Sequence, residues 1–149
     1  MFKKHAYIKL FVIIFSMHIS FVISSDVYAD YNSKHDELAE RCSKRTSEIF
    51  NKDYPIPTWK MPDGNTWSIR YEKHYNSRLS KCFMLIKTIV TGPDKEFVCN
   101  SHLLLNVDEN REYGEFLDFR KSEITCYLLN KLCSTKSEWD VLAEPFMSE

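Results

Sequence analysis

The sequence predicts a small α+β domain, in which an antiparallel meander of four to five strands is packed by an N-terminal and a C-terminal helix. Three observations lead to this fold class. The spacing of apolar residues is helical up to about residue 52, alternates between about 67 and 129, and is helical again after 135. Short clusters of turn-forming residues separate the alternating stretches. Because a meander with one apolar face must be covered, the two helices are expected to pack on it.

The first helix is expected to begin at Ser33 and to end near Lys52. Asp36 follows Ser33 at the spacing of a capping box, in which the two residues satisfy free backbone N–H groups. Apolar residues then recur near one side of the helix, at Leu38, Cys42, Ile49 and Phe50. The segment Tyr54–Pro57 cannot continue a helix, because proline lacks a backbone N–H and restricts the residue before it.

The strands are expected after a loop over residues 55–65, whose turn is Pro62-Asp63-Gly64. Alternating stretches predict strands at residues 67–72, 81–90, 97–107, 112–119 and 124–129. The second of these has a nearly continuous apolar run, which predicts that both of its faces are covered. Residues 74–76, 91–94, 108–110 and 130–131 are expected to link or turn the chain.

A second helix is expected near the end of the sequence. Thr135 and Glu138 have the spacing of another capping box. Apolar residues follow at i, i+3, i+4 and i+7, the spacing of a buried helix face, at Trp139, Leu142, Ala143 and Phe146. Pro145 lies late in this helix and is expected to bend or end it.

Residues 1–29 are expected to be a signal peptide, which leaves residues 30–149 as a single α+β domain. Three lysines give the segment a positive start, Leu10–Ile23 is apolar and uncharged, and Val27-Tyr28-Ala29 matches the small-x-Ala pattern of a cleavage site. The alternative is an uncleaved anchor. It is less favoured because a spanning helix needs about 20 residues, whereas the apolar run has 14. We therefore expect a periplasmic or secreted protein with no stable membrane anchor after cleavage.

The charge balance argues against two classes of partner. The chain has a net charge of −1, and without residues 1–29 the net charge becomes −3. A nucleic-acid-binding domain would show a basic stripe, and an acidic domain has no general attraction to an anionic membrane surface. The sequence contains no Asn-x-Ser/Thr glycosylation site, which favours a bacterial product among exported proteins.

All five cysteines follow the leading segment, and in an exported protein they are expected to form disulfides. An odd number leaves at least one thiol unpaired within the chain. Cys126 and Cys133 flank an expected turn, where a hairpin would bring them together. A bridge between Cys42 and Cys82 would join the first helix to the second strand and leave Cys99 free. Sequence does not determine connectivity, so bridges that include Cys99 stay open.

Five segments are informative as a group: Tyr71–Asn76, Leu79–Phe83, Asp108–Gly114, Cys126–Cys133 and Glu138–Met147. Together they resemble a family of small exported bacterial proteins of unknown function. That family combines a signal peptide, an HYN…L.KCF segment, a DEN.EYG hairpin, paired cysteines and a C-terminal helix of the type E(W/F)D…P(F/Y)M. The resemblance covers most of the chain after residue 29. It implies the compartment and the domain boundaries, and it implies no activity, substrate or catalytic residue.

His74 is the centre of the most polar cluster in the alternating region. A histidine near Asn76 and Cys82 would suit a small thiol hydrolase, in which Cys82 is the nucleophile. A nucleophile needs an accessible thiolate, whereas Cys82 lies in an apolar stretch and suits a bridge. We therefore predict no catalytic residue, and expect Tyr75 and Asn76 to shape a turn.

Two patterns bear a partial likeness to metal sites. Cys99 and His102 form half of a zinc pattern, but residues three apart on a strand point to opposite faces. Asp108, Asn110 and Glu112 alternate like the start of a calcium loop. This sequence lacks the glycine and the final glutamate that such a loop requires. A charged hairpin turn explains this second pattern, so no metal or cofactor is predicted.

Three side chains are candidate contacts for a protein partner: Trp59, His74 and Tyr75. Trp59 lies in the expected proline-rich loop, whereas Trp67 and Trp139 fall on expected core faces. We expect a binding or interaction module, because such a module needs only a rigid surface and a few anchors. An enzyme would need convergent polar groups in a pocket. A small hydrolase that uses His74 and a structural envelope component are the alternatives, and the oligomeric state is left open.

Overall fold

The computed structural model describes residues 33–120 and 122–148. Residues Leu38–Glu149 form one compact unit, which holds the sheet. The expected signal peptide lies outside the described residues. Among the described residues, no helix is both long enough and apolar enough to cross a membrane.

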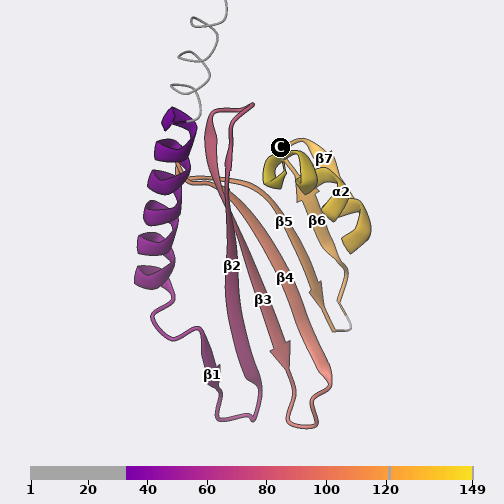
Figure 1. Cartoon of the computed structure of the whole chain (residues 1–149). Helices are drawn as coiled ribbons and strands as arrows, with labels where there is room; N and C mark the ends of the chain where they lie inside the picture. Colours follow the sequence, from indigo (N-terminus) through magenta and orange to yellow (C-terminus); the bar gives the residue numbers. More distant parts are fainter. Residues whose placement is uncertain (1–32, 121, 149) are drawn as a thin grey trace, which may run out of the picture. The chain divides into compact units, whose positions relative to one another are not determined.

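Seven described strands form one sheet, in which each strand pairs antiparallel with its neighbour in the chain (Figure 1). They are β1 (Thr58–Lys60), β2 (Thr66–Asn76), β3 (Lys81–Thr91), β4 (Phe97–Asn106), β5 (Arg111–Phe119), β6 (Thr125–Leu128) and β7 (Lys131–Leu132). A helix covers residues 33–53, and α2 covers Lys136–Met147. The antiparallel meander and the α+β class are confirmed, while the expected number of four to five strands is too low.

Both additional strands lie at the edges of the sheet and are very short. β1 lies inside the loop expected over 55–65, where Trp59 pairs with Trp67 of β2. β7 lies where we expected a turn, and its two residues pair with Tyr127 and Leu128 of β6. A strand of two or three residues is too short to show a period of two, so the alternation of apolar residues does not reveal it.

β2 is also longer than expected, because it continues through the link predicted at residues 74–76. Those three residues pair with Lys81–Phe83 of β3. The turn that follows depends on Asn76, whose Oδ1 accepts a hydrogen bond from the backbone N–H of Leu79 at 2.9 Å. The left-handed conformation in this turn belongs to Ser80, with a φ of 51°. Asn76 therefore shapes the turn through its side chain, while its own backbone stays in the strand.

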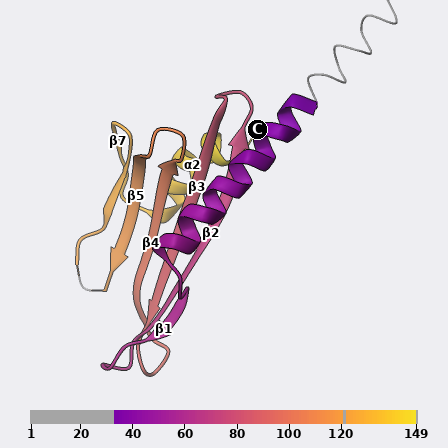
Figure 2. The same cartoon turned by 90° about the vertical axis from the view of Figure 1, so that its left-hand side faces the viewer.

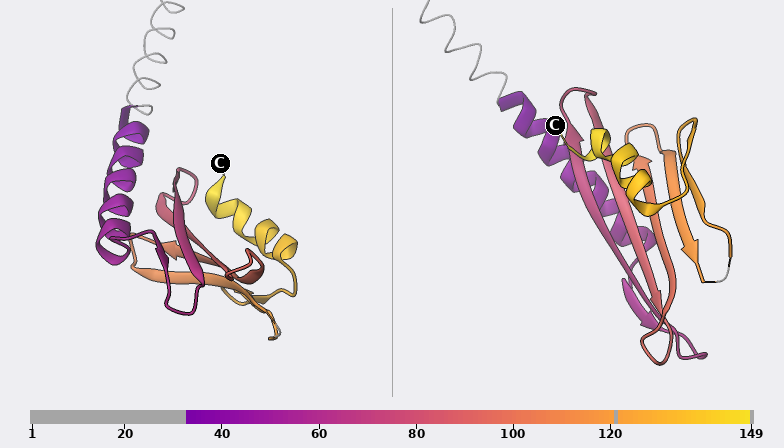
Figure 3. Two further views of the ribbon diagram at one scale, coloured as in Figure 1. Left: turned by 90° about the horizontal axis from the view of Figure 1, so that it is seen from below. Right: turned by 90° about the vertical axis from the view of Figure 1, so that its right-hand side faces the viewer.

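The two helices cover opposite faces of the sheet. The helix over 33–53 is hereafter the N-terminal helix, and in Figure 2 its residues 38–53, which belong to the same unit as the sheet, pass in front of β2. In the right-hand view of Figure 3, from the other side, α2 lies in front of the sheet and the N-terminal helix behind it. β3 serves both layers, because successive side chains of a strand point to opposite faces. It is largely buried, as its continuous apolar run predicts.

Each face carries its own buried cluster of side chains. The N-terminal cluster consists of Cys42, Phe50, Ile69, Cys82, Met84, Ile86 and Val107. The α2 cluster consists of Phe83, Leu85, Leu104, Tyr113, Phe116, Cys126, Leu128, Trp139 and Ala143. Alternate residues of β3, such as Met84 and Leu85, enter different clusters, so the strand joins the two halves of the core.

α2 begins with the expected cap. The side chain of Thr135 accepts a hydrogen bond from the N–H of Glu138, and the Glu138 carboxylate accepts one from the N–H of Ser134 at 2.7 Å. At the other end the helix continues past Pro145 to Met147. There the side-chain Nδ2 of Asn76 donates to the carbonyl groups of Pro145 and Ser148, both at 2.9 Å. A buried residue of β2 therefore holds the end of α2 on the sheet.

Two disulfides are present, Cys42–Cys82 and Cys126–Cys133, with Cα atoms 5.4 Å and 5.0 Å apart. This is the pairing that the sequence analysis favours. The first joins the N-terminal helix to β3, and the second joins β6 to the residue after β7. Cys99 is free and buried.

Candidate functional site

The three side chains considered as partner contacts do not share one surface. His74 pairs with Phe83 and Tyr75 with Cys82, so His74 faces the α2 cluster and Tyr75 the N-terminal cluster. Trp59 is half-buried, and its ring stacks on Trp67 with centroids 5.6 Å apart. Trp59 and Tyr75 both pack against the N-terminal cluster. Trp59 is therefore half-exposed in an aromatic pair that holds β1 against β2, and its role as a partner contact stays a prediction.

The surroundings of His74 do not match those of a thiol hydrolase. Cys82 is bonded to Cys42, so it has no thiolate with which to attack a substrate. The Nε2 atom of His74 is buried, with no hydrogen-bond partner among the described residues. Nothing in this geometry activates a nucleophile.

Neither partial metal pattern forms a cluster of ligands. Cys99 pairs with Val90 of β3 and therefore points to the face that carries the N-terminal cluster. The His102 ring packs against Trp139 on the opposite face. Asp108 accepts a hydrogen bond from the N–H of Cys82 at 2.8 Å and forms an ion pair with Arg45 at 3.5 Å. Within residues 33–120 and 122–148, no group of three or more His, Cys, Asp or Glu side chains is placed to hold a metal ion.

A buried histidine lies under the first turns of α2. His102 is 6% exposed, and its ring meets Trp139 edge to face at 5.5 Å. Burial, together with the positive charges of Lys136 and Lys87, lowers the pKa of His102 to about 4. Its Nδ1 and the Nε1 of Trp139 are buried without hydrogen-bond partners among the described residues. A buried polar atom without a partner is costly, and a proton on His102 would add a charge to the same buried contact. The contact between His102 and Trp139 is therefore sensitive to protonation of the histidine.

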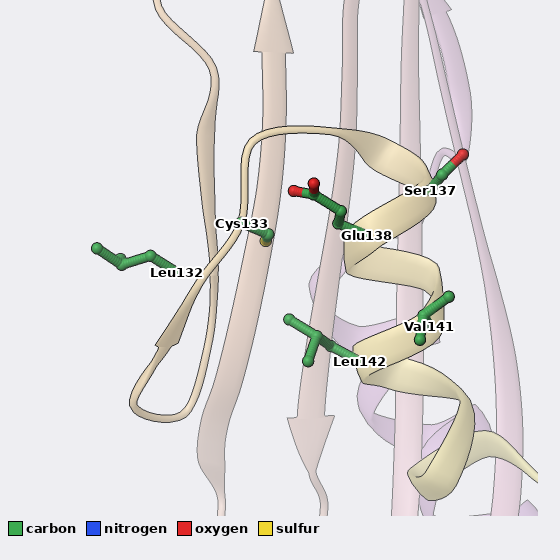
Figure 4. A pocket seen from close by; sticks show the side chains of 6 residues that line it. All are labelled: Leu132, Cys133, Ser137, Glu138, Val141 and Leu142. Carbon is green, nitrogen blue, oxygen red and sulfur yellow. The ribbon is translucent and has the colours of Figure 1, made fainter.

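The described surface is hollowed between α2 and the β6–β7 hairpin. Figure 4 shows the first of two hollows, of about 420 Å³, whose lining is Leu132, Cys133, Ser137, Glu138, Val141 and Leu142. The second hollow, also of about 420 Å³, lies beside the hairpin turn and the end of α2, between Lys131 and Phe146. Leu142 lines both hollows, so they adjoin. We call the pair the α2–β7 groove.

The α2–β7 groove is largely apolar, and large apolar side chains stand exposed around it. The exposed fractions are 88% for Leu132, 67% for Val141 and 44% for Leu129. Its polar rim includes Lys131 and Glu138. Exposed apolar side chains that gather beside a concave surface are typical of a binding site rather than of a random surface.

Sequence reasoning did not identify this groove. Lys131 was expected in a turn, and Leu132 received no role. Val141 falls outside the i, i+3, i+4, i+7 series that predicts the buried face of α2, so the pattern assigns it to solvent. The sequence signal for the groove consists of Val141 on the polar side of the expected helix and Leu132 directly after the expected turn, and neither residue is informative alone.

Burial and contacts change the pKa values of two further side chains, Cys99 in β4 and Tyr127 in β6. Burial raises the pKa of the Cys99 thiol, and the negative charges of Asp118 and Glu115 raise it further. The hydrogen bond to Glu112 raises the pKa of Tyr127 to about 12. Both groups are therefore protonated at neutral pH, and neither is poised as a base or nucleophile.

Comparison of the chain with protein-family models, with curated proteins and with solved structures gives no match at any of the three levels. The resemblance to a family of small exported proteins therefore stays an expectation, and the case for a function depends on the geometry of the chain itself.

Proposed function

We propose that this chain is a small exported binding module, held together by two disulfides, whose α2–β7 groove takes a protein partner. The observation that carries the proposal is the groove itself, with an apolar lining beside Leu132 and Val141, the two most exposed large apolar side chains in the described residues. An interface of this kind gains most of its affinity from a few buried apolar anchors.

The rigidity of the two walls supports the same function. The hairpin wall is closed by the Cys126–Cys133 disulfide, and the helix wall is held at its two ends by the Thr135 cap and by Asn76. Side chains that are already ordered lose little conformational entropy when a partner binds. The site that would take the partner is thus built on fixed elements.

Export is part of the proposal, and two features support it. The leading segment has the charge, length and cleavage pattern of a signal peptide. Two disulfides are present in the described structure, and such bonds persist in oxidising compartments. Fractionation of cells that express the tagged full chain should place a product shortened by about 29 residues in the periplasm or the medium.

The groove is tested with a photo-crosslinking amino acid at one of two matched positions. Val141 and Ile56 are similarly exposed, at 67% and 64%, but only Val141 lines the groove. We expect a discrete protein adduct from position 141 in cells that make the full chain, and none from position 56. Val141→Asp should abolish capture by an affinity tag, while Ile56→Asp should retain it. Equal adducts from both positions would show that contacts are non-specific and would contradict the proposal.

A further inference from the structure

A second surface lies at the outer edge of β7, next to the α2–β7 groove. Leu132 is 88% exposed, and Figure 4 shows its side chain pointing away from α2. Its partner across the hairpin is Tyr127, which lies on the opposite face from Cys126 and Leu128. Leu132 is therefore an apolar side chain at the last strand of the sheet, on the face that α2 does not cover.

The backbone of Leu132 also points outward. In an antiparallel pair, hydrogen-bonded and non-hydrogen-bonded residue pairs alternate along the ladder. Cys133 donates its N–H to the carbonyl of Cys126 at 3.0 Å, so that residue pair is a hydrogen-bonded one. The neighbouring pair, Tyr127 with Leu132, is then non-hydrogen-bonded, and the N–H and C=O of Leu132 face away from β6. An outward donor and acceptor on an edge strand form a template for another strand.

We infer that a second copy of this chain pairs with this edge, β7 against β7, about a two-fold axis at Leu132. An antiparallel hydrogen-bonded pair of identical residues has such an axis between them, and the interface is then self-complementary. The two Leu132 residues exchange both backbone hydrogen bonds. Their side chains lie opposite each other on the same face, which covers the most exposed large apolar residue in the described structure.

The charges beside the axis are complementary in this arrangement. With Leu132 opposite its own copy, Lys131 lies across from Cys133 of the second copy. Cys133 adjoins Ser134, whose N–H donates to the Glu138 carboxylate. Lys131 and Glu138 make no ion pair within the described part of the chain, and both line the face that carries α2. The two-fold axis therefore sets each Lys131 beside a Glu138 of the other copy, twice in one interface.

The dimer places the two α2–β7 grooves on the same face of one continuous sheet, because a two-fold axis perpendicular to the sheet keeps both α2 helices on one side. The dimer interface shares Leu132, Lys131 and Glu138 with the lining of the groove, whereas Val141 lines the groove and has no part in the dimer interface, so Val141→Asp tests the partner site alone. The two proposals can therefore fail separately.

Sedimentation equilibrium of the purified, disulfide-bonded protein expressed from the full chain tests the inference. We expect dimers at about 100 µM, and at least a tenfold weaker association for Leu132→Asp. Val141→Asp should leave the dimer unchanged. Native near-ultraviolet circular dichroism establishes that each variant is folded.

A charge exchange provides the sharper test. Lys131→Glu and Glu138→Lys should each weaken the dimer, and the double variant should recover most of the lost association, which should also fall as salt is added. A wild-type protein that stays monomeric at about 100 µM would overturn the inference. So would a dimer that Leu132→Asp leaves intact, or a double variant that is no stronger than either single one.

Discussion

The two faces of the sheet are held by different means. On the N-terminal face, a disulfide joins residues 40 apart in the chain, and Ser47 and Ser43 bond to Tyr71 and Lys73 of β2 at 2.9 Å and 2.5 Å. On the α2 face, the disulfide joins residues only seven apart, within one hairpin and its flank. The first face is tied across the fold, whereas the second depends on packing and a few hydrogen bonds.

The α2 face also holds the three buried polar atoms that have no partner among the described residues, the Nε2 of His74, the Nδ1 of His102 and the Nε1 of Trp139. The α2–β7 groove lies at the same helix. The difference teaches that a disulfide ties the helix to the sheet on one layer, whereas on the other layer the disulfide closes a hairpin and α2 itself is held by packing and hydrogen bonds.

Removal of each disulfide in turn is the largest test of this contrast. In the chain-entropy account a bridge that closes a longer loop stabilises more, so Cys42→Ala with Cys82→Ala should cost about 4 kcal/mol in the free energy of unfolding. Cys126→Ala with Cys133→Ala should cost about 2 kcal/mol. Urea unfolding of the two double variants measures both values. An equal cost for the two bridges would remove the proposed difference between the faces.

The second-largest effect is expected from acid, which should lower the free energy of unfolding through the α2 face. The pKa of His102 in the folded chain is about 4, below its ordinary value of 6.5, because burial disfavours the charged ring. As the pH falls, the unfolded chain therefore binds the proton first. The stability that depends on neutral His102 is present above pH 6.5 and is lost between about 6.5 and 4, up to about 3 kcal/mol.

The acid test is urea unfolding at pH 7, 5.5 and 4 for the wild type and His102→Gln. The carboxylates titrate in both proteins, so the difference between the two curves isolates the histidine. We expect the wild type to lose more stability than the variant over this interval. Parallel curves would mean that His102 is accessible to protons in the folded state.

Asn76 should show a smaller effect, again on the α2 face. Asn76→Ala removes two hydrogen bonds to the end of α2 and one in the β2–β3 turn, and leaves buried backbone groups unpaired. We expect a loss of about 2 kcal/mol. The matched change on the other face is Thr46→Val, which removes a bond from the buried Thr46 hydroxyl to Cys42 O within the helix, and should cost less than about 1 kcal/mol. Hydrogen exchange in α2 should rise for the first variant alone.

The elements that the sequence predicts well are those that carry a period. β3, β4 and β5 span eight residues or more, so their alternation is readable, and the capping residues Thr135 and Glu138 mark the start of α2. The pairing Cys126–Cys133 follows from a turn between two cysteines. In each case the signal lies within about ten consecutive residues.

The features that escaped prediction depend on contacts between distant residues. Trp59 forms a strand because Trp67 lies opposite, and His74–Asn76 continue β2 because β3 provides partners for them. The α2–β7 groove lies between α2 and the β6–β7 hairpin, so it depends on how these two elements pack beside each other. No local pattern records such an arrangement.

The burial of Cys99 has a consequence for the chemistry of the other four cysteines. A protein thiol breaks a disulfide by attack of its thiolate on sulfur. Cys99 is 6% exposed, and its raised pKa keeps the sulfur in the unreactive protonated form. Cys99 therefore takes no part in thiol–disulfide exchange. Once the two disulfides have formed, the free cysteine does not rearrange them into mismatched bridges.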